Sequence, residues 1–440
     1  MFLIYIVSSI TLILTLPPLT IASNPLYMSI LFLSFLSILL SSFSADPFSY
    51  NLFILDDVAL LLSYVTFIVI FISYITSFSL RTSFSYLSSM LLLFLSCFAV
   101  FSSSSFLLLY VFYESSLLPI IYIILKWGVY PDRDSRALSM LLFTSIFTFP
   151  LGVLIFSILL KSSRLHIYFL SFSTLDNVFL SYWIMFRFAV KLPVYGLHFW
   201  LPQAHVEAPT FGSIILAGIL LKIGSCGLLR LSYFISPSLL TSSYLISCYL
   251  MVATVLRSVF CAMQSDFKRL VAYSSVVHMT VLLLLLLTPS PLSYKSILFL
   301  SVFHAFSSPS LFLLVGSYYD LFSTRLLLIL RGILLATPLL CLFSTLVFIL
   351  NVPVPPFPSF LAEIFMFFCV FHLTCLSWYF ILLLSFLVIV YSLLWYVTSS
   401  FGAVVPSSVS QYQSPSLLTY LSFSSYLSPS VTLLLLLSTF

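Results

Sequence analysis

Charged side chains are scarce in this chain. Asp, Glu, Lys and Arg make up only 6% of its 440 residues, whereas hydrophobic residues make up 62%. Soluble proteins contain about 25% charged residues, because these side chains cover the surface that faces water. The composition therefore excludes a water-soluble globular domain and indicates a polytopic membrane protein. The formal net charge of +5 is small, and we expect no nucleic-acid partner.

The sequence also lacks the usual signatures of cofactor and metal sites. It has no Gly-rich phosphate loop, no dinucleotide-binding fingerprint and no metal triad. Its seven cysteines form no CxxC or Cys/His pattern, so we interpret them as small buried hydrophobic residues. We therefore expect no cofactor and no metal on this chain, and any redox chemistry that drives it would take place on another chain.

Hydrophobic runs of about 20 residues, long enough to cross a bilayer as helices, recur along the whole chain. They predict an all-α fold with about 14 transmembrane helices. The N-terminus lacks a basic or Arg-rich leader, so the first run is predicted to be a span rather than a cleaved peptide. The predicted spans lie near residues 2–21, 26–44, 56–79, 84–102, 104–125, 138–160, 179–206, 211–233, 240–260, 270–288, 295–319, 330–373, 376–398 and 415–438.

Two of these runs are too long for one simple span, and both are interrupted by proline. One breaks at Leu192-Pro193, directly after Lys191, and the other breaks in the Pro-rich stretch 351–358, shortly before Glu363. Proline removes a helical hydrogen bond and kinks or ends a helix, so the prolines alone could be simple kinks. Broken spans at matching places in two halves of a chain are typical of transporters with an internal repeat and a mid-membrane site.

Basic residues are concentrated in the odd-numbered loops between the predicted spans. Positive residues accumulate on the cytoplasmic or matrix side of a membrane, so these loops are predicted to lie there and both termini on the opposite side. The odd-numbered loops contain Arg81, Lys126, Arg133, Arg136, Arg257, Lys268, Arg269, Arg325 and Arg331, whereas the even-numbered loops contain Lys161, Arg164 and Lys295.

A series of ionisable side chains falls inside the predicted spans. A charged residue at the bilayer centre costs about 2.5–3.5 kcal/mol on insertion scales, and such residues face protein or trapped water and commonly carry ions. Alternating acids, lysines and histidines is the pattern that a proton relay requires, because each group must exchange a proton near neutral pH, and burial moves the pKa of lysine down and that of glutamate up towards this range. The series consists of Glu114, Lys191, Lys222, His278, His304 and Glu363.

Each residue of this series also has a structural interpretation. Glu114 could pair with a lysine simply to anchor two helices, and Lys222 could snorkel to the surface if its span is shifted by a turn. His278 and His304 could be neutral, hydrogen-bonded packing residues.

Other polar residues in the spans and loops favour structural interpretations more strongly. His198 and His205 lie near the helix break or the membrane edge, where structural hydrogen bonding is at least as good an explanation as a relay. Arg187 lies one turn before Lys191 and is predicted to lie nearer the interface. The loop 126–136 is predicted to be a solvated, aromatic-belted turn.

Several segments of the chain form recognisable motifs. They are Val190–Thr210 with Gly212–Leu231, Tyr113–Pro119 with Lys126–Gly128, Asp266–His278, His304–Ser308 with Tyr319–Arg325, and Val352–Glu363. Together these segments resemble a known family, the antiporter-like membrane subunits of respiratory NADH–quinone oxidoreductase, and the mitochondrial members most of all. The resemblance covers residues 110–400 and leaves the first 100 residues and the tail after Phe401 matched only in hydropathy.

The resemblance implies an architecture of two inverted repeats of about five helices, each with a broken helix and a half-channel. The repeats would occupy residues 84–235 and 236–400, with N-terminal helices in 1–83 and a C-terminal helix in 401–440.

The resemblance also implies roles for the ionisable series. Glu114 and Lys191 would be the ion pair of the first repeat, and Lys222 the connecting lysine. His278 would be a histidine of the central axis, His304 the family's histidine of span 11, and Glu363 the terminal acid of the second repeat. The sequence departs from the family pattern at Ala305, Pro309, Pro358 and Ala362, which bears on the geometry of the second repeat.

The implied function is that of a core membrane subunit of a proton-translocating NADH:ubiquinone reductase in the mitochondrial inner membrane, with both termini towards the intermembrane space. Its partners would be the other subunits of the complex, including neighbouring antiporter-like chains, and membrane lipids; flavin and iron–sulfur clusters would lie on other subunits. Three alternatives stay open: a stand-alone cation/proton antiporter subunit, a sister antiporter-like chain of the same complex, and a membrane scaffold that has lost transport.

Overall fold

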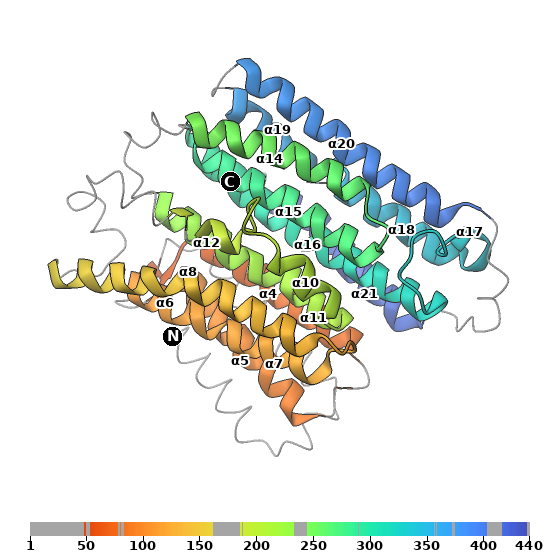
Figure 1. The fold of residues 1–440 in the computed structure, drawn as a ribbon, viewed down its shortest axis with the longest axis horizontal. Helices are drawn as coiled ribbons and strands as arrows, with labels where there is room; N and C mark the ends of the chain where they lie inside the picture. Colours follow the sequence, from red (N-terminus) through yellow and green to blue (C-terminus); the bar gives the residue numbers. More distant parts are fainter. Residues whose placement is uncertain are drawn as a thin grey trace.

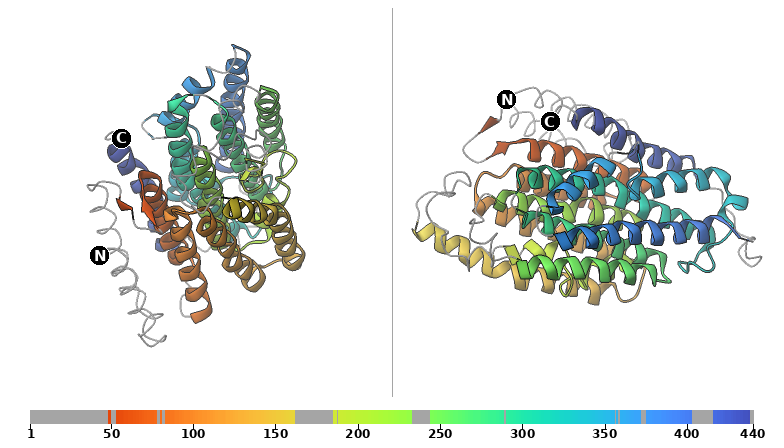
Figure 2. Two further views of the ribbon diagram at one scale, coloured as in Figure 1. Left: turned by 90° about the vertical axis from the view of Figure 1, so that its left-hand side faces the viewer. Right: turned by 90° about the horizontal axis from the view of Figure 1, so that it is seen from above.

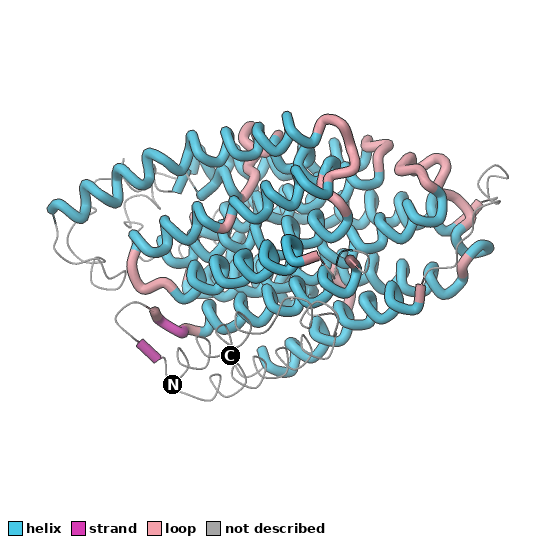
Figure 3. Tube along the Cα trace, turned by 90° about the horizontal axis from the view of Figure 1, so that it is seen from below, coloured by secondary structure: helices cyan, strands magenta, loops and turns pink. Residues whose placement is uncertain are grey.

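The computed structural model describes residues 48–49, 53–77, 80, 83–161, 185–186, 188–232, 244–288, 290–355, 357, 359–371, 375–402 and 416–437. Within these residues the chain is a bundle of long helices, most of which run along one common direction (Figures 1 and 2). A two-stranded hairpin of β1 (Phe48–Ser49) and β2 (Ile54–Leu55) precedes the first described helix. Short loops join the helices at both ends of the bundle (Figure 3).

The predicted all-α membrane fold is confirmed, since nine described helices are long and apolar enough to cross a bilayer. The predicted spans 2–21 and 26–44, together with Arg187 and Pro358, lie outside the described residues. The helices are α4 (Asp57–Thr76), α5 (Phe84–Ser102), α6 (Phe106–Ser115), α7 (Leu117–Trp127), α8 (Arg133–Lys161), α10 (Trp200–Glu207), α11 (Thr210–Ile215), the π-helix η3 (Leu216–Leu220), α12 (Leu221–Ser232), α14 (Tyr244–Ala262), α15 (Phe267–Leu286), α16 (Pro291–Phe322), α17 (Ile333–Ala336), α18 (Pro338–Asn351), α19 (Ser359–Phe371), α20 (Cys375–Ser400) and α21 (Leu417–Leu437).

Two spans occupy the centre of the bundle. The most apolar stretches of Thr210–Arg230 and of Leu292–Phe322 are buried along their whole length. The long helix α16 contacts α4, α11, η3, α12, α15, α18, α19 and α21. Lys222 on the first of these stretches and His304 on the second are therefore surrounded by protein and not by lipid.

Both proline-interrupted spans are broken where the sequence predicts. The first is helical up to Lys191, continues as non-helical residues 192–199, and resumes as α10. The second ends its first helix, α18, at Asn351, has non-helical residues at 352–355 and 357, and resumes as α19. We call residues 192–199 the break segment. In each span the chain leaves the helical path two residues before a proline, as the missing N–H group requires.

The helical residues before the break segment pack closely on α12 because α12 carries two glycines on that side. A Cβ atom at Gly227 would overlap the ring of Phe188, and one at Gly224 would lie 3.2 Å from Leu192 Cγ. Small residues allow helix backbones to approach closely in a membrane, so Gly224 and Gly227 set the distance between Lys191 and α12.

We expect Gly227→Ala to destabilise the fold, because an added methyl group in a filled interior costs about 1–3 kcal/mol. Thermal unfolding of the protein in detergent measures the effect. Gly224→Ala is the matched control and should lose less, because its nearest neighbour is the movable Leu192 side chain. Unchanged stability of Gly227→Ala would contradict this packing.

Candidate functional site

Lys222 and His304 meet at the centre of the molecule. The Lys222 amine lies 2.8 Å from His304 Nδ1 and donates a hydrogen bond to the carbonyl of Ala217 at 3.1 Å. Lys222 is completely buried and His304 is 6% exposed. The snorkelling interpretation of Lys222 is therefore wrong, because its amine points into the protein.

The π-helix η3 lies directly before Lys222 and contains the carbonyl that its amine contacts. A Cβ atom at Gly218 would lie 2.7 Å from Val69 on α4 and 2.9 Å from Pro309 on α16, so the wide turn fits between these two helices. π-Turns within helices occur frequently at functional sites. Pro309, one of the departures from the family pattern, thus packs against the turn that precedes the lysine.

His278 extends the cluster towards α15. Its ring centroid lies 5.4 Å from that of His304, and its Nε2 atom is buried without a hydrogen-bond partner in the part of the chain that the structure describes. His304 Nδ1 also lies 3.4 Å from the hydroxyl of Ser308, which donates to the His304 carbonyl. Lys222, His304 and His278 thus form one cluster, which draws on α12, α16 and α15.

Lys191 lies at the end of the helix before the break segment and contacts Tyr113. Its amine donates to the Tyr113 carbonyl at 3.3 Å and lies 2.8 Å from the centroid of the Tyr113 ring. A Cβ atom at Gly224, two residues from Lys222, would lie 3.5 Å from Lys191 Cβ. Lys191 therefore approaches the central cluster across α12.

Glu114 lies beside Lys191 without forming a salt bridge to it in the described part of the chain. Its Oε1 atom is buried and has no hydrogen-bond partner among the described residues, and its carboxylate is close enough to act on the charge of Lys191. The helix is interrupted after Ser115, where Pro119 cannot donate to the Ser115 carbonyl. Glu114 and Lys191 are thus neighbours, as expected, but the lysine amine contacts Tyr113 and not the carboxylate.

Glu363 lies on α19, which packs against α16. Its charge acts on Tyr391 of α20, and Asn351 at the second break lies next to the same tyrosine. The Tyr391 hydroxyl and Asn351 Nδ2 are buried and have no hydrogen-bond partner among the described residues. The site therefore continues into the second broken span through neutral polar groups.

Two histidines near the first break differ in their surroundings. His198 contacts the guanidinium group of Arg257. His205 stacks on Phe312 with centroids 4.4 Å apart, and neither of its ring nitrogens has a partner in the described structure. The expectation of structural hydrogen bonding is right for His198 and wrong for His205, because an apolar helix face covers the His205 ring.

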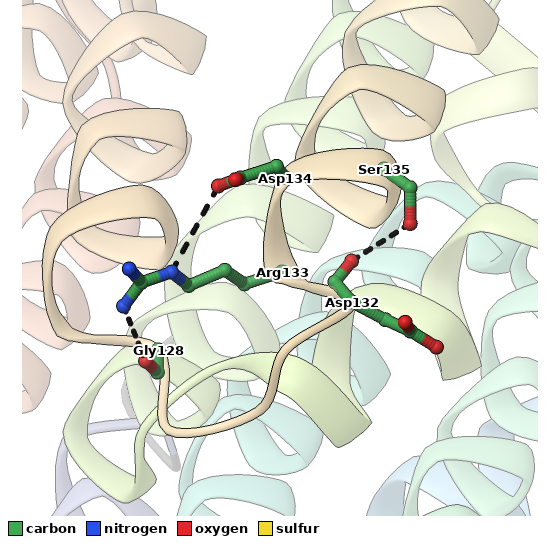
Figure 4. A network of polar contacts seen from close by, with 5 residues as sticks. All are labelled: Gly128, Asp132, Arg133, Asp134 and Ser135. Atoms are coloured by element: carbon green, nitrogen blue, oxygen red, sulfur yellow. Dashed lines mark hydrogen bonds and ion pairs between the residues drawn. The ribbon is translucent and has the colours of Figure 1, made fainter.

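The loop between α7 and α8 is an exposed turn, as its composition predicts. Arg133 donates to the Gly128 carbonyl at 2.9 Å and lies 3.8 Å from the Asp134 carboxylate, while the Ser135 hydroxyl donates to the Asp132 carbonyl at 2.8 Å (Figure 4). These contacts are local to the turn.

Three buried cations were not singled out from the sequence. Arg257 and Lys268 were assigned to loops, but the structure places them inside α14 and α15 with exposures of 6% and 4%. Two fewer basic residues therefore support the predicted orientation. Arg230, the third, lies two turns after Lys222 on α12 and is 3% exposed. Arg257 falls within the predicted span 240–260, and this position could have identified it as a buried residue from the sequence.

Arg230 forms an ion pair that joins three elements. Its Nη1 atom lies 3.1 Å from Asp56 Oδ2 at the start of α4, and its Nη2 atom donates to the Phe101 carbonyl at the end of α5 at 2.8 Å. At the opposite end of the bundle, Arg325 lies 3.9 Å from the Tyr130 ring. The odd-numbered loops that contain Tyr130 and Arg325 therefore meet at one end, and Arg230 anchors α12 at the other.

Known proteins match this arrangement. The family described as "NADH:quinone oxidoreductase/Mrp antiporter, TM" matches residues 103–392. NADH-ubiquinone oxidoreductase chain 4 of Locusta migratoria is 37% identical over 314 residues, 69% of each chain. The chain 4 of Ceratitis capitata is 34% identical over 319 residues, 72% of each chain. The chain belongs to the NADH–ubiquinone oxidoreductase chain 4 family.

Solved structures agree on the fold of this family. A chain of respiratory complex I from Thermus thermophilus with bound NADH superimposes with a TM-score of 0.82 at 20% identity, covering 96% of this chain and 92% of that chain. A chain of the Mrp complex from Dietzia sp. gives a TM-score of 0.71 at 16% identity, covering 80% and 68%. At these identities the likeness establishes the fold alone.

We expect Asp56→Leu to destabilise the protein strongly, because it leaves Arg230 buried without its carboxylate. Removing one partner of a buried pair costs about 3–5 kcal/mol, whereas replacing both partners is often neutral. The double variant Asp56→Leu/Arg230→Leu should therefore recover much of the lost stability. Thermal unfolding of the three proteins measures this, and additive losses would contradict it.

Proposed function

We propose that this chain is a proton-translocating core membrane subunit of the respiratory NADH:ubiquinone oxidoreductase of the mitochondrial inner membrane. The observation that carries the proposal is the direct contact of Lys222 with His304 in the buried centre of the bundle. A lysine amine and an imidazole within hydrogen-bond distance can exchange a proton. Burying polar groups in an apolar interior costs free energy. Packing alone would therefore not require a lysine and a histidine at this place.

The relay would run from Glu114 and Lys191 through Lys222, His304 and His278 to Glu363. The Glu114 carboxylate favours the protonated form of Lys191 while it is close, and separation of the two favours release of the proton towards Lys222. The Lys191 amine contacts the Tyr113 carbonyl, and a movement that brings it towards or away from Glu114 would switch between these two cases. Water between Lys191 and Lys222, and between His278 and Glu363, would complete the path.

The wider arrangement follows from the family. Residues 84–235 and 236–400 would form two inverted repeats, each with one broken helix. The partners would be the other subunits of the complex, with flavin and iron–sulfur clusters held by those subunits and no cofactor on this chain. Electron transfer elsewhere would drive the protons through this chain.

Two rival functions have distinct outcomes. A stand-alone antiporter subunit would exchange Na⁺ for H⁺ as a purified chain without the large complex. A scaffold that has lost transport would pump normally when Glu114 is replaced by Gln. The retention of the whole ionisable series favours transport, since each buried polar group costs free energy and packing alone does not require the series.

We expect Lys222→Arg to assemble and to lower proton translocation per NADH oxidised. An arginine keeps a fixed positive charge but cannot release a proton, because its pKa stays above 12. Proton uptake and NADH oxidation measured together in membranes carrying the variant test this. Lys222→Ala should also impair translocation with only a modest loss of assembly. Wild-type stoichiometry in Lys222→Arg would remove Lys222 from the relay.

We further propose that the odd-numbered loops face the matrix and both termini face the intermembrane space. Basic residues near Tyr130 and Arg325 support this orientation, although Arg257 and Lys268 no longer count towards it. In mitoplasts, a protease should remove a C-terminal tag and leave the loop near Arg133 intact. Cleavage at that loop with protection of the tag would reverse the orientation.

A further inference from the structure

The break segment has a backbone that only a specific sequence can adopt. Gly196 has a φ angle of +90°, in the region that glycine populates without strain. The segment begins at Leu192, directly after Lys191, and α10 resumes the helix at Trp200. Because the segment has no regular helical ladder, other elements must fix its position, and that position sets where Lys191 lies.

Helix α14 holds the break segment at two points that lie two turns apart. The Tyr249 hydroxyl donates to the Tyr195 carbonyl at 2.9 Å. The Arg257 guanidinium lies 3.0 Å from His198 Nδ1 and contacts Nε2 as well. The same guanidinium lies 4.7 Å from the centroid of the Tyr195 ring. Both contacts come from one face of α14, which packs beside α15 (Figure 1).

Arg257 is a buried cation without an acidic partner in the described part of the chain. Its surroundings are His198 and the aromatic rings of Tyr195, Phe260 and Tyr273, the last two at 5.8 Å and 5.3 Å. Arginine stays protonated, and a buried charge must be hydrogen-bonded to be tolerated. The imidazole lone pair and the ring faces supply that compensation. Arg257 therefore depends on the break segment, and the break segment is held by Arg257.

We propose that Arg257 is a positioning residue of the relay, which through His198 latches the break segment to α14 and so fixes Lys191 beside Tyr113 and α12. The inference rests on the proposed proton translocation. It adds that the first broken span is held in place by the helix that begins the second half of the chain. A movement of α14 against α12 would then change the separation of Lys191 from its neighbours.

The test uses the intact complex in membranes. Arg257→Leu removes the latch and the buried charge together, so we expect assembled complex with fewer protons translocated per NADH. A misplacement of about 1 Å at a reacting group can lower a rate by about 10²-fold. Arg269→Leu is the control, because Arg269 is a half-exposed surface arginine on the neighbouring helix that pairs with Asp266 at 3.3 Å. It should behave as wild type.

Variants of His198 separate positioning from packing. His198→Gln keeps an acceptor for Arg257 and should retain most of the stoichiometry, whereas His198→Phe keeps the aromatic packing and should lose it. Arg257→Leu/His198→Phe should be no worse than either single change, since both remove one contact. If Arg257→Leu fails to assemble, the two single variants His198→Gln and His198→Phe still test the contact, because both leave the arginine in place.

The outcomes distinguish this inference from the proposed function. Normal stoichiometry per assembled complex in Arg257→Leu, or equal behaviour of His198→Gln and His198→Phe, would overturn the latch. If Lys222→Arg is impaired in the same membranes, the relay stands and only the latch fails. If both variants pump normally, the relay itself fails.

Discussion

The contact between Lys222 and His304 is the polar interaction around which the ionisable groups of the interior are arranged. It joins the two spans whose most apolar stretches are completely buried. A lysine amine in such a place must have a hydrogen-bond partner, because burying an unpaired charge is costly. The π-helix before Lys222 supplies the Ala217 carbonyl, and α16 supplies the imidazole. The central helices are thus arranged around one polar contact in an apolar interior.

The two broken spans bring further polar groups towards this central contact. A continuous helix satisfies its own backbone and would cover Lys191 and Asn351 with a further helical turn. By ending the helix at these residues, the prolines allow irregular backbone at membrane depth, which is tolerated only where protein or water surrounds it. The glycines of α12 then bring the first break close to Lys222. Sequence features that would weaken an ordinary helix therefore act together to bring ionisable groups close to one another.

Much of the fold could be predicted from the sequence, because hydropathy and proline determine spans and breaks directly. The described helices follow the predicted spans from α4 to α21, and both breaks fall where the prolines lie. The membership of the family could also be predicted from the motifs around Lys191 and Lys222. Helix ends were harder to predict, since Arg257 and Lys268 were placed in loops although they are buried within helices.

The geometry of the site could be predicted only in part from the sequence. The sequence identified the residues at depth, but spacing along a chain does not determine which side chain a lysine amine contacts. Glu114 and Lys191 therefore appeared as a direct pair, whereas the structure places Tyr113 against the lysine. The role of Arg257 depends on the path of the break segment, which no periodicity in α14 reveals. Contacts made by non-helical segments could not be predicted from the sequence.

The most direct test of this account is a density map of the intact membrane complex at a resolution that shows ordered water. We expect the Lys222 amine to contact His304 and ordered waters to link Lys191 to Lys222 and His278 to Glu363. Dry, closely packed apolar side chains filling both gaps, or a Lys222 amine turned towards lipid, would contradict it.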